Sequence, residues 1–187
     1  MDALELLLTR DSALKLEPPA PDARALDAIL KSALRAPDHG RLRPWRFVVI
    51  PGDRRERFGE VLAASLKRRE PGAPPEALAR ERQKALRAPL ILIVAARVKP
   101  SEKIPEVEQI VSAGAAAQNV MLAAHALGYG AMWRTGAPAY DPEVKRALGL
   151  DSRDSIIGFI YLGTRAGGAS PLPRPGPEEF VQVWSEN

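Results

Sequence analysis

The chain has no cysteine, which excludes disulfide bonds, thiolate metal sites and thiol catalysis. Its only histidines are His39 and His125, and no HExxH or similar cluster accompanies them, so we predict no metal site. The sequence also lacks the GxGxxG fingerprint of dinucleotide-binding folds and the phosphate-binding P-loop. No arrangement of serine, histidine and aspartate has a supporting sequence context either. If this protein carries out redox chemistry, it must therefore use an organic cofactor.

A signal peptide is not expected, because the N-terminus carries Asp2 and Glu5 and no basic run. Residues 110–133 contain no Asp, Glu, Lys or Arg, over a length that could span a bilayer. Polar side chains interrupt this stretch, among them Ser112 and His125, and they would be costly in lipid. We therefore expect a helix buried within protein, no membrane contact and a cytoplasmic location, which the absence of cysteine also suits.

The net charge of +4 raises the question of nucleic-acid binding. Residues 53–87 hold ten basic and six acidic side chains, so their excess of four accounts for the charge of the whole chain. The two signs are mixed at helical spacing, and no aromatic residues interleave with the basic ones as in single-strand-binding proteins. We expect a solvated, charged helical lobe and no nucleic-acid partner.

The periodicity of apolar residues predicts both helices and strands within one domain over residues 1–187. Helices are predicted over 2–10, from Asp22 to Pro37, over 53–87 in two parts, over 106–127 and over 141–148, and strands over 45–50, 89–96, 129–134 and 156–162. The elements do not alternate as regular βα units, so we predict an α+β fold in which helices flank a mostly antiparallel central sheet. Residues 164–187 are rich in Gly and Pro and predict an extended C-terminal arm.

Three short segments carry side chains suited to binding an anion or a flat ring. Arg10 and Ser12 follow the first helix and offer a guanidinium and a hydroxyl to a phosphate, although Asp-Ser after a helix is often only a turn. A second segment, from Arg35 to Trp45, gathers three arginines around a helix end, which equally fits a basic C-terminal cap. In the third, residues 128–136, glycines flank an apolar strand that would let a flat ring approach, or that is an ordinary strand.

In their order and spacing, these segments resemble the FMN-dependent nitroreductase family, and in particular its small YdjA-like branch. The stretches that carry the resemblance are MDALELLLTRDS, ALRAPDHGRLRPWRFVVI, SAGAAAQNVMLAAHALGYGAMWRTGA and IIGFIYLGT. They run from residue 1 to about residue 164 and leave out the charged lobe and the tail. The resemblance implies an α+β homodimer with two FMN sites, each built from both subunits, and it makes helix 106–127 the dimer spine.

The resemblance also assigns roles to individual residues. One protomer would bind the phosphate end of FMN, and the other would reach the same flavin from the loop near Pro37. The strand near Trp133 would line the isoalloxazine ring. The residues implied to contact FMN are Arg10, Asp11, Ser12, Arg35, Pro37, His39, Ala131, Met132, Trp133, Arg134, Thr135 and Gly163. No side chain is expected to act as a catalytic nucleophile or a metal ligand, because the flavin carries the chemistry.

The chain departs from the family pattern in the phosphate-binding segment. Many members have a second basic residue where this chain has Asp11, and larger relatives have a basic residue where it has Leu14. Because an inward-pointing acid would repel a phosphate, we expect the backbone amide of Asp11 to make the contact. Lys15, Arg165 or Arg174 could supply the missing positive charge.

The activity implied by the resemblance is that of an FMN-dependent NAD(P)H oxidoreductase. Its acceptors would be small nitro compounds, quinones or activated alkenes, reduced by two electrons in a ping-pong mechanism with NADH or NADPH as reductant. Positive charge from Arg35 or Arg134 would stabilise the anionic reduced flavin. The main alternative is an FMN-binding carrier or redox sensor without significant turnover. Residues 53–87 have no assigned role, and a substrate lid is one possibility.

Overall fold

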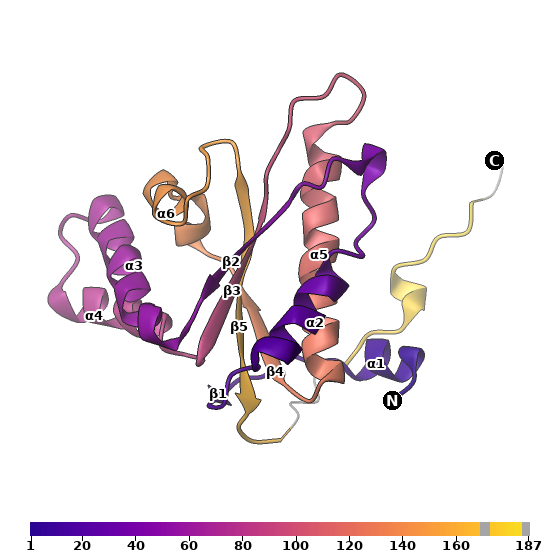
Figure 1. Cartoon of the computed structure of the whole chain (residues 1–187), viewed down its shortest axis with the longest axis horizontal. Helices are drawn as coiled ribbons and strands as arrows, with labels where there is room; N and C mark the ends of the chain where they lie inside the picture. The colour runs from indigo at the N-terminus through magenta and orange to yellow at the C-terminus, as the bar shows by residue number, and fades with distance from the viewer. Residues whose placement is uncertain (169–172, 185–187) are drawn as a thin grey trace.

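The computed structural model describes residues 1–168 and 173–184, and it is built on one antiparallel sheet with helices on both faces (Figure 1). The strands are β1 (Leu16–Glu17), β2 (Trp45–Ile50), β3 (Leu90–Ala96), β4 (Gly130–Arg134) and β5 (Ser155–Arg165). Strand β5 is central, since it pairs with β3, β4 and β1, and β2 pairs with the other side of β3. The α+β fold with an antiparallel sheet predicted from the sequence is confirmed.

The helices follow the sequence prediction closely. They are α1 (Ala3–Thr9), α2 (Ala23–Ala33), α3 (Arg55–Arg69), α4 (Pro75–Lys84), α5 (Glu106–Ala126) and α6 (Pro142–Ala147). Asp2 begins α1 with a capping box that includes Glu5, and the carboxylate of Asp22 caps α2. No helix in the described ranges combines the length and hydropathy of a membrane span.

Helices α2 and α5 cover one face of the sheet. Half of the buried residues of α5 are alanines, and Ala113, Ala116, Ala117 and Ala124 are fully buried. Small side chains let the helix backbone approach the strands closely, and the resulting core includes Leu92 of β3. Each large aliphatic side chain buried in this way contributes about 1.5–3 kcal/mol to folding.

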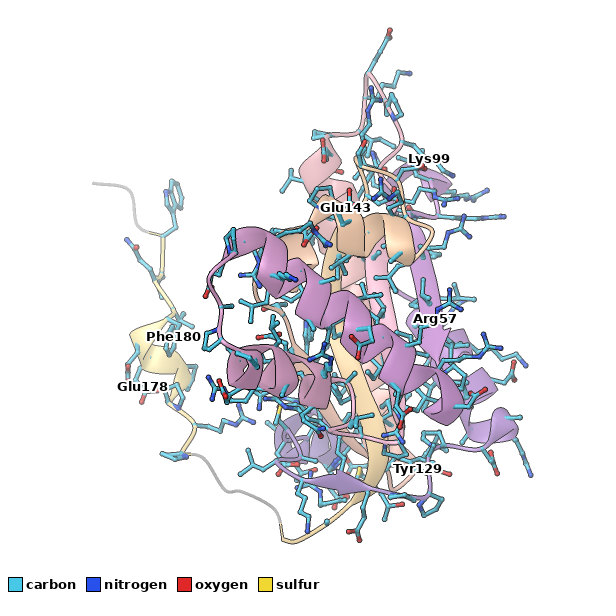
Figure 2. The ribbon with its side chains drawn as sticks, turned by 90° about the vertical axis from the view of Figure 1, so that its left-hand side faces the viewer. Arg57, Lys99, Tyr129, Glu143, Glu178 and Phe180 are labelled. Carbon is cyan, nitrogen blue, oxygen red and sulfur yellow. The ribbon has the colours of Figure 1, made fainter. Side chains whose placement is uncertain are left out.

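The charged lobe of α3 and α4 covers the opposite face (Figure 1). Phe58 and Leu62 of α3 are buried against the sheet, while most charged side chains of the lobe, such as Arg57, point outward (Figure 2). Helix α4 packs on α3 at Gly59, where an added Cβ would lie 2.9 Å from the carbonyl oxygen of Arg82. The lobe is therefore a packed layer of the domain, with its polar side in solvent.

The end of the sheet differs from the sequence prediction. Strand β5 continues through Thr164 to Arg165, because Leu16 and Glu17 pair with its last residues as the short strand β1. Beyond it, residues 173–184 stand away from the sheet, with a short 3-10 helix at Pro177–Glu179 and with Phe180 exposed (Figure 2). Residues 169–172 and 185–187 of the expected C-terminal arm lie outside the described residues.

Candidate functional site

The first predicted segment, Arg10 to Ser12, lies directly beside strand β4. The backbone N–H of Ala13 donates a hydrogen bond to the carbonyl oxygen of Ala131 at 2.9 Å. The approach requires glycine at position 130, because an added Cβ there would lie 2.6 Å from Cδ2 of Leu16 and 3.0 Å from Cβ of Ala13. The fold thus brings the first and third segments together within one chain.

Two basic residues from the end of the chain join this segment. Arg165 pairs with the carboxylate of Asp11 through both terminal guanidinium nitrogens, one of them at 3.1 Å. Arg174 donates a hydrogen bond of 3.3 Å to the carbonyl oxygen of Arg10. Three basic residues were named as possible compensation for the acid at position 11. The structure brings Arg165 and Arg174 to the Arg10–Ser12 segment, while the side chain of Lys15 is exposed.

The side chains of β4 alternate between the two faces of the sheet. Ala131 and Trp133 face α2 and α5, and the indole nitrogen of Trp133 donates to the carbonyl oxygen of Ile157 at 3.1 Å. Met132 and Arg134 face the lobe and line cavities there.

Two further predicted residues, Thr135 and Gly163, lie close to β4. Thr135 follows β4 and lines the larger cavity described below. Gly163 pairs with Gly130 across the strands, and an added Cβ on it would lie 2.6 Å from Cδ of Pro89. Close packing of the chain therefore accounts for the glycine at position 163.

Two adjoining cavities lie between the lobe and strands β4 and β5. The larger, of about 430 Å³, reaches from the apolar side chains of Phe58 and Leu62 to the turn after β4. The smaller, of about 300 Å³, reaches Ala13 and Leu14 beside the first segment. Three residues line both cavities: Arg87, Arg134 and Tyr161. Together the cavities extend from Ala13 and Leu14, which directly follow the Arg10–Ser12 segment, to Phe58 and Leu62 of the lobe.

The cavity walls carry both signs of charge. Tyr161 is buried, and burial raises the pKa of its hydroxyl, although Arg87 and Arg134 act in the opposite direction. The hydroxyl is therefore protonated at neutral pH and can donate a hydrogen bond. Glu81 of α4 is also buried; its Oε1 pairs with Lys84, whereas its Oε2 has no hydrogen-bond partner among the described residues. A buried carboxylate oxygen without a hydrogen-bond partner favours a ligand that carries a hydrogen-bond donor.

Four cavity residues, Glu81, Lys84, Arg87 and Tyr161, were not predicted from the sequence. Glu81, Lys84 and Arg87 are spaced three residues apart, so their side chains lie on the same side of the chain at the end of the lobe. That spacing, directly before the buried strand β3, was the available signal. It was obscured because mixed charges in a lobe usually indicate a solvated surface.

The second predicted segment lies at the other end of α5 from β4 (Figure 1). His39 Nδ1 lies 2.6 Å from Oε2 of Glu108 in the first turn of α5, and both side chains are exposed. Ser112 donates to the carbonyl oxygen of Pro37 at 2.6 Å and accepts from the indole of Trp45. Arg35 is exposed nearby. Helix α5 has 21 residues, so about 30 Å of helix separates its two ends within one chain.

Comparison with known proteins identifies the family. A sequence model of the nitroreductase family matches residues 7–164. The chain belongs to the nitroreductase family. It is 43% identical over 185 residues to YdjA of Escherichia coli (strain K12), a protein named as an NAD(P)H nitroreductase, and the match covers 98% of this chain and 100% of YdjA. The predicted membership of the small YdjA-like branch is confirmed.

Solved nitroreductase structures share the fold. A nitroreductase-like protein from Bacillus cereus superposes with a TM-score of 0.84 at 22% identity, covering 98% of this chain and 96% of its own. A nitroreductase structure from Desulfovibrio desulfuricans, in complex with FMN, has a TM-score of 0.76 at 28% identity and covers 98% of both chains. The nitroreductase fold therefore extends over nearly the whole chain.

Proposed function

We propose that this nitroreductase binds FMN along the two adjoining cavities and uses NADH or NADPH to reduce small organic acceptors by two electrons. One observation carries the proposal: the hydrogen bond between Ala13 and Ala131 joins the Arg10–Ser12 segment to the strand that lines both cavities. A flavin mononucleotide needs an anion site at one end and a slot for a flat ring at the other. The FMN-bound relative and the name of YdjA support the same cofactor and reductants.

The side chains around the larger cavity fit the polar edge of a flavin. That edge presents an imide N–H between two carbonyl oxygens. The unpartnered Oε2 of Glu81 is an acceptor for such a donor, and Lys84, Arg87 and Arg134 are donors for the flanking oxygens. The match in hydrogen-bonding type argues for a flavin and against a purely apolar ligand.

The bound flavin would supply the redox chemistry, accepting a hydride equivalent from NAD(P)H and passing two electrons to the acceptor. The chain would contribute binding and electrostatics. Arg87 and Arg134 would stabilise the negative charge that develops on the ring when it is reduced. The apolar wall of Phe58, Leu62 and Phe159 would keep water from that side of the ring. Because reductant and acceptor would share one cavity, the first must leave before the second enters, which is a ping-pong mechanism.

A second copy of the chain would complete the site. His39 lies at the far end of α5 from β4, and Arg35 follows α2 on the face of the sheet opposite the cavities, so neither is placed at a flavin in its own chain. An antiparallel pairing of two α5 helices would bring Arg35 and His39 of the partner subunit to the C-terminal end of α5, where β4 begins and the Arg10–Ser12 segment forms the phosphate end of the proposed site. The outer face of α5 supports the pairing, since Val107 and Val111 are exposed one turn apart.

The proposal is tested by the visible spectrum of the purified protein, with the cofactor released by heat and identified by mass. We expect a yellow protein that yields about one FMN per chain, is bleached by NADH or NADPH and is reoxidised by a nitroaromatic compound. A colourless protein that takes up no added FMN would contradict the proposal. A yellow protein that neither NADH nor NADPH reduces would indicate a flavin carrier or redox sensor.

A further inference from the structure

The pair formed by Asp11 and Arg165 is the most unusual feature of the proposed phosphate end. The contact is bidentate, and the side chains are only 15% and 23% exposed. It lies one residue from Arg10, whose carbonyl oxygen accepts a hydrogen bond from Arg174. An acid paired with one arginine therefore lies next in sequence to Arg10, at the place where the proposed function requires an anion site.

The charges at this end balance a phosphate only if Asp11 is neutralised. A phosphate monoester carries about −1.5 to −2 charges at neutral pH. Within the described ranges, neither Arg10 nor Arg174 forms an ion pair with a carboxylate, so these two cations match the phosphate. An uncompensated carboxylate at position 11 would cancel half of their charge.

The pair is not required to hold the segment in place. The backbone bond from Ala13 to Ala131 ties the segment to β4, and a second bond, from the N–H of Ala166 to the carbonyl oxygen of Lys15, ties it to the end of β5. Strand β1 adds the ladder between Leu16 and Arg165. Replacing the Asp11 carboxylate should therefore change the local charge more than the local backbone.

We propose that Arg165 is a positioning residue that neutralises Asp11, so that Arg10 and Arg174 present two uncancelled charges to the phosphate of FMN. The inference rests on the proposed function and concerns only its phosphate end. It predicts that removing the charge of Arg165 and removing the charge of Asp11 change the affinity for FMN in opposite directions. Loss of Arg165 removes the guanidinium charge that is paired with the Asp11 carboxylate and weakens FMN binding, whereas loss of the Asp11 charge leaves Arg165 with an uncancelled charge and strengthens FMN binding.

The test is the FMN dissociation constant of the apoprotein, measured by flavin fluorescence for wild type, Asp11→Asn, Arg165→Met and the double variant. We expect Arg165→Met to weaken binding about tenfold and Asp11→Asn to tighten it several-fold, by about the effect of one partly screened charge. The double variant should return close to wild type. Arg165→Lys keeps the charge and should stay within about threefold of wild type, which guards against a folding defect in Arg165→Met.

Riboflavin, which has no phosphate, serves as the matched ligand control, and its affinity should be the same for all the variants. The inference is overturned if Asp11→Asn binds FMN as wild type does or more weakly, or if riboflavin responds in the same way as FMN. The pair would then only support the fold of the segment. A wild-type chain that binds riboflavin and FMN equally would overturn it too, and one that binds neither would overturn the proposed function as well.

Discussion

The two faces of the sheet are covered in contrasting ways. On one face, the fully buried alanines of α5, such as Ala117, bring the helix backbone close to the strands. On the other, longer side chains of the lobe, such as Leu62 and Leu66, hold α3 and α4 further out, and cavities remain over β4 and β5. Small side chains thus produce a close-packed face, and large ones produce the face with room for a ligand.

The largest effect on the stability of the fold should come from overpacking the closed face. Ala117→Leu adds three carbon atoms at a fully buried position, so α5 must move away from the sheet, and we expect a loss of about 1–3 kcal/mol in the free energy of unfolding. Denaturant unfolding measures this loss. The same substitution at Ala64, exposed on α3, should change stability by less than about 0.5 kcal/mol. Equal losses at both positions would remove the contrast between the faces.

The next effect concerns the phosphate end of the open face. Arg10→Ala should weaken FMN binding by about 10- to 100-fold, because a charge-assisted hydrogen bond to phosphate contributes about 1.5–3 kcal/mol. Equilibrium dialysis or flavin fluorescence measures the affinity. Arg24→Ala removes an exposed arginine from α2 and should leave the affinity unchanged. An Arg10→Ala protein that purifies fully loaded with FMN would contradict the assignment.

A smaller effect is expected at the ring end. Arg134→Met removes a cation that lines both cavities, so the reduced flavin should be less stable and the two-electron potential should fall by about 30 mV, equivalent to about 1.4 kcal/mol. A dye-coupled reductive titration of the bound flavin measures the potential. Arg46→Met, on the exposed side of β2, is the control. An unchanged potential in Arg134→Met would place the ring elsewhere.

The smallest effect concerns how the stability of the fold depends on pH through Asp141, which begins α6. Burial disfavours ionisation of Asp141, but the hydrogen bond of 3.0 Å from Arg68 and the positive charge of Arg68 outweigh it and lower the pKa of this carboxyl. A lowered folded-state pKa stabilises the fold above the unfolded value of about 3.9, and this contribution is lost as the pH falls through the folded pKa.

Asp141→Asn keeps a good cap for α6 but removes the charge. Its free energy of unfolding should therefore be lower than that of wild type at pH 7 by about 1 kcal/mol or less, and the difference should shrink at about pH 3. Chemical unfolding at both pH values measures it. If the difference in the free energy of unfolding between the two proteins increased at low pH, the pKa of Asp141 would not be lowered in the folded state.

The sequence predicted the family, the antiparallel sheet and most element boundaries, because these depend on local patterns. Asp22 followed by apolar residues at helical spacing specifies α2, and the continuous apolar run of β3 specifies a strand buried on both faces. The segments around Arg10 and Met132 were also found from the sequence, and the fold brings them together through the bond between Ala13 and Ala131.

The parts that the sequence left undecided depend on tertiary packing. Glu81 differs from other acids of the lobe only in facing the sheet, and that depends on how α4 packs on α3. Arg165 reaches Asp11 because β5 pairs with β1, a strand of two residues that is too short to leave a pattern. The sequence did contain a signal for Trp133. Neighbouring residues of a strand point to opposite faces of the sheet, so Trp133 and Met132 are expected on different faces.

The most direct test of the account is a crystal structure of the FMN-loaded protein. We expect the isoalloxazine ring on the lobe face, beside Arg87, Arg134 and Tyr161, and the phosphate at Arg10 and Arg174. Arg35 and His39 of the partner subunit should contact the same flavin. A flavin bound on the α5 face, or one enclosed by a single chain, would contradict it.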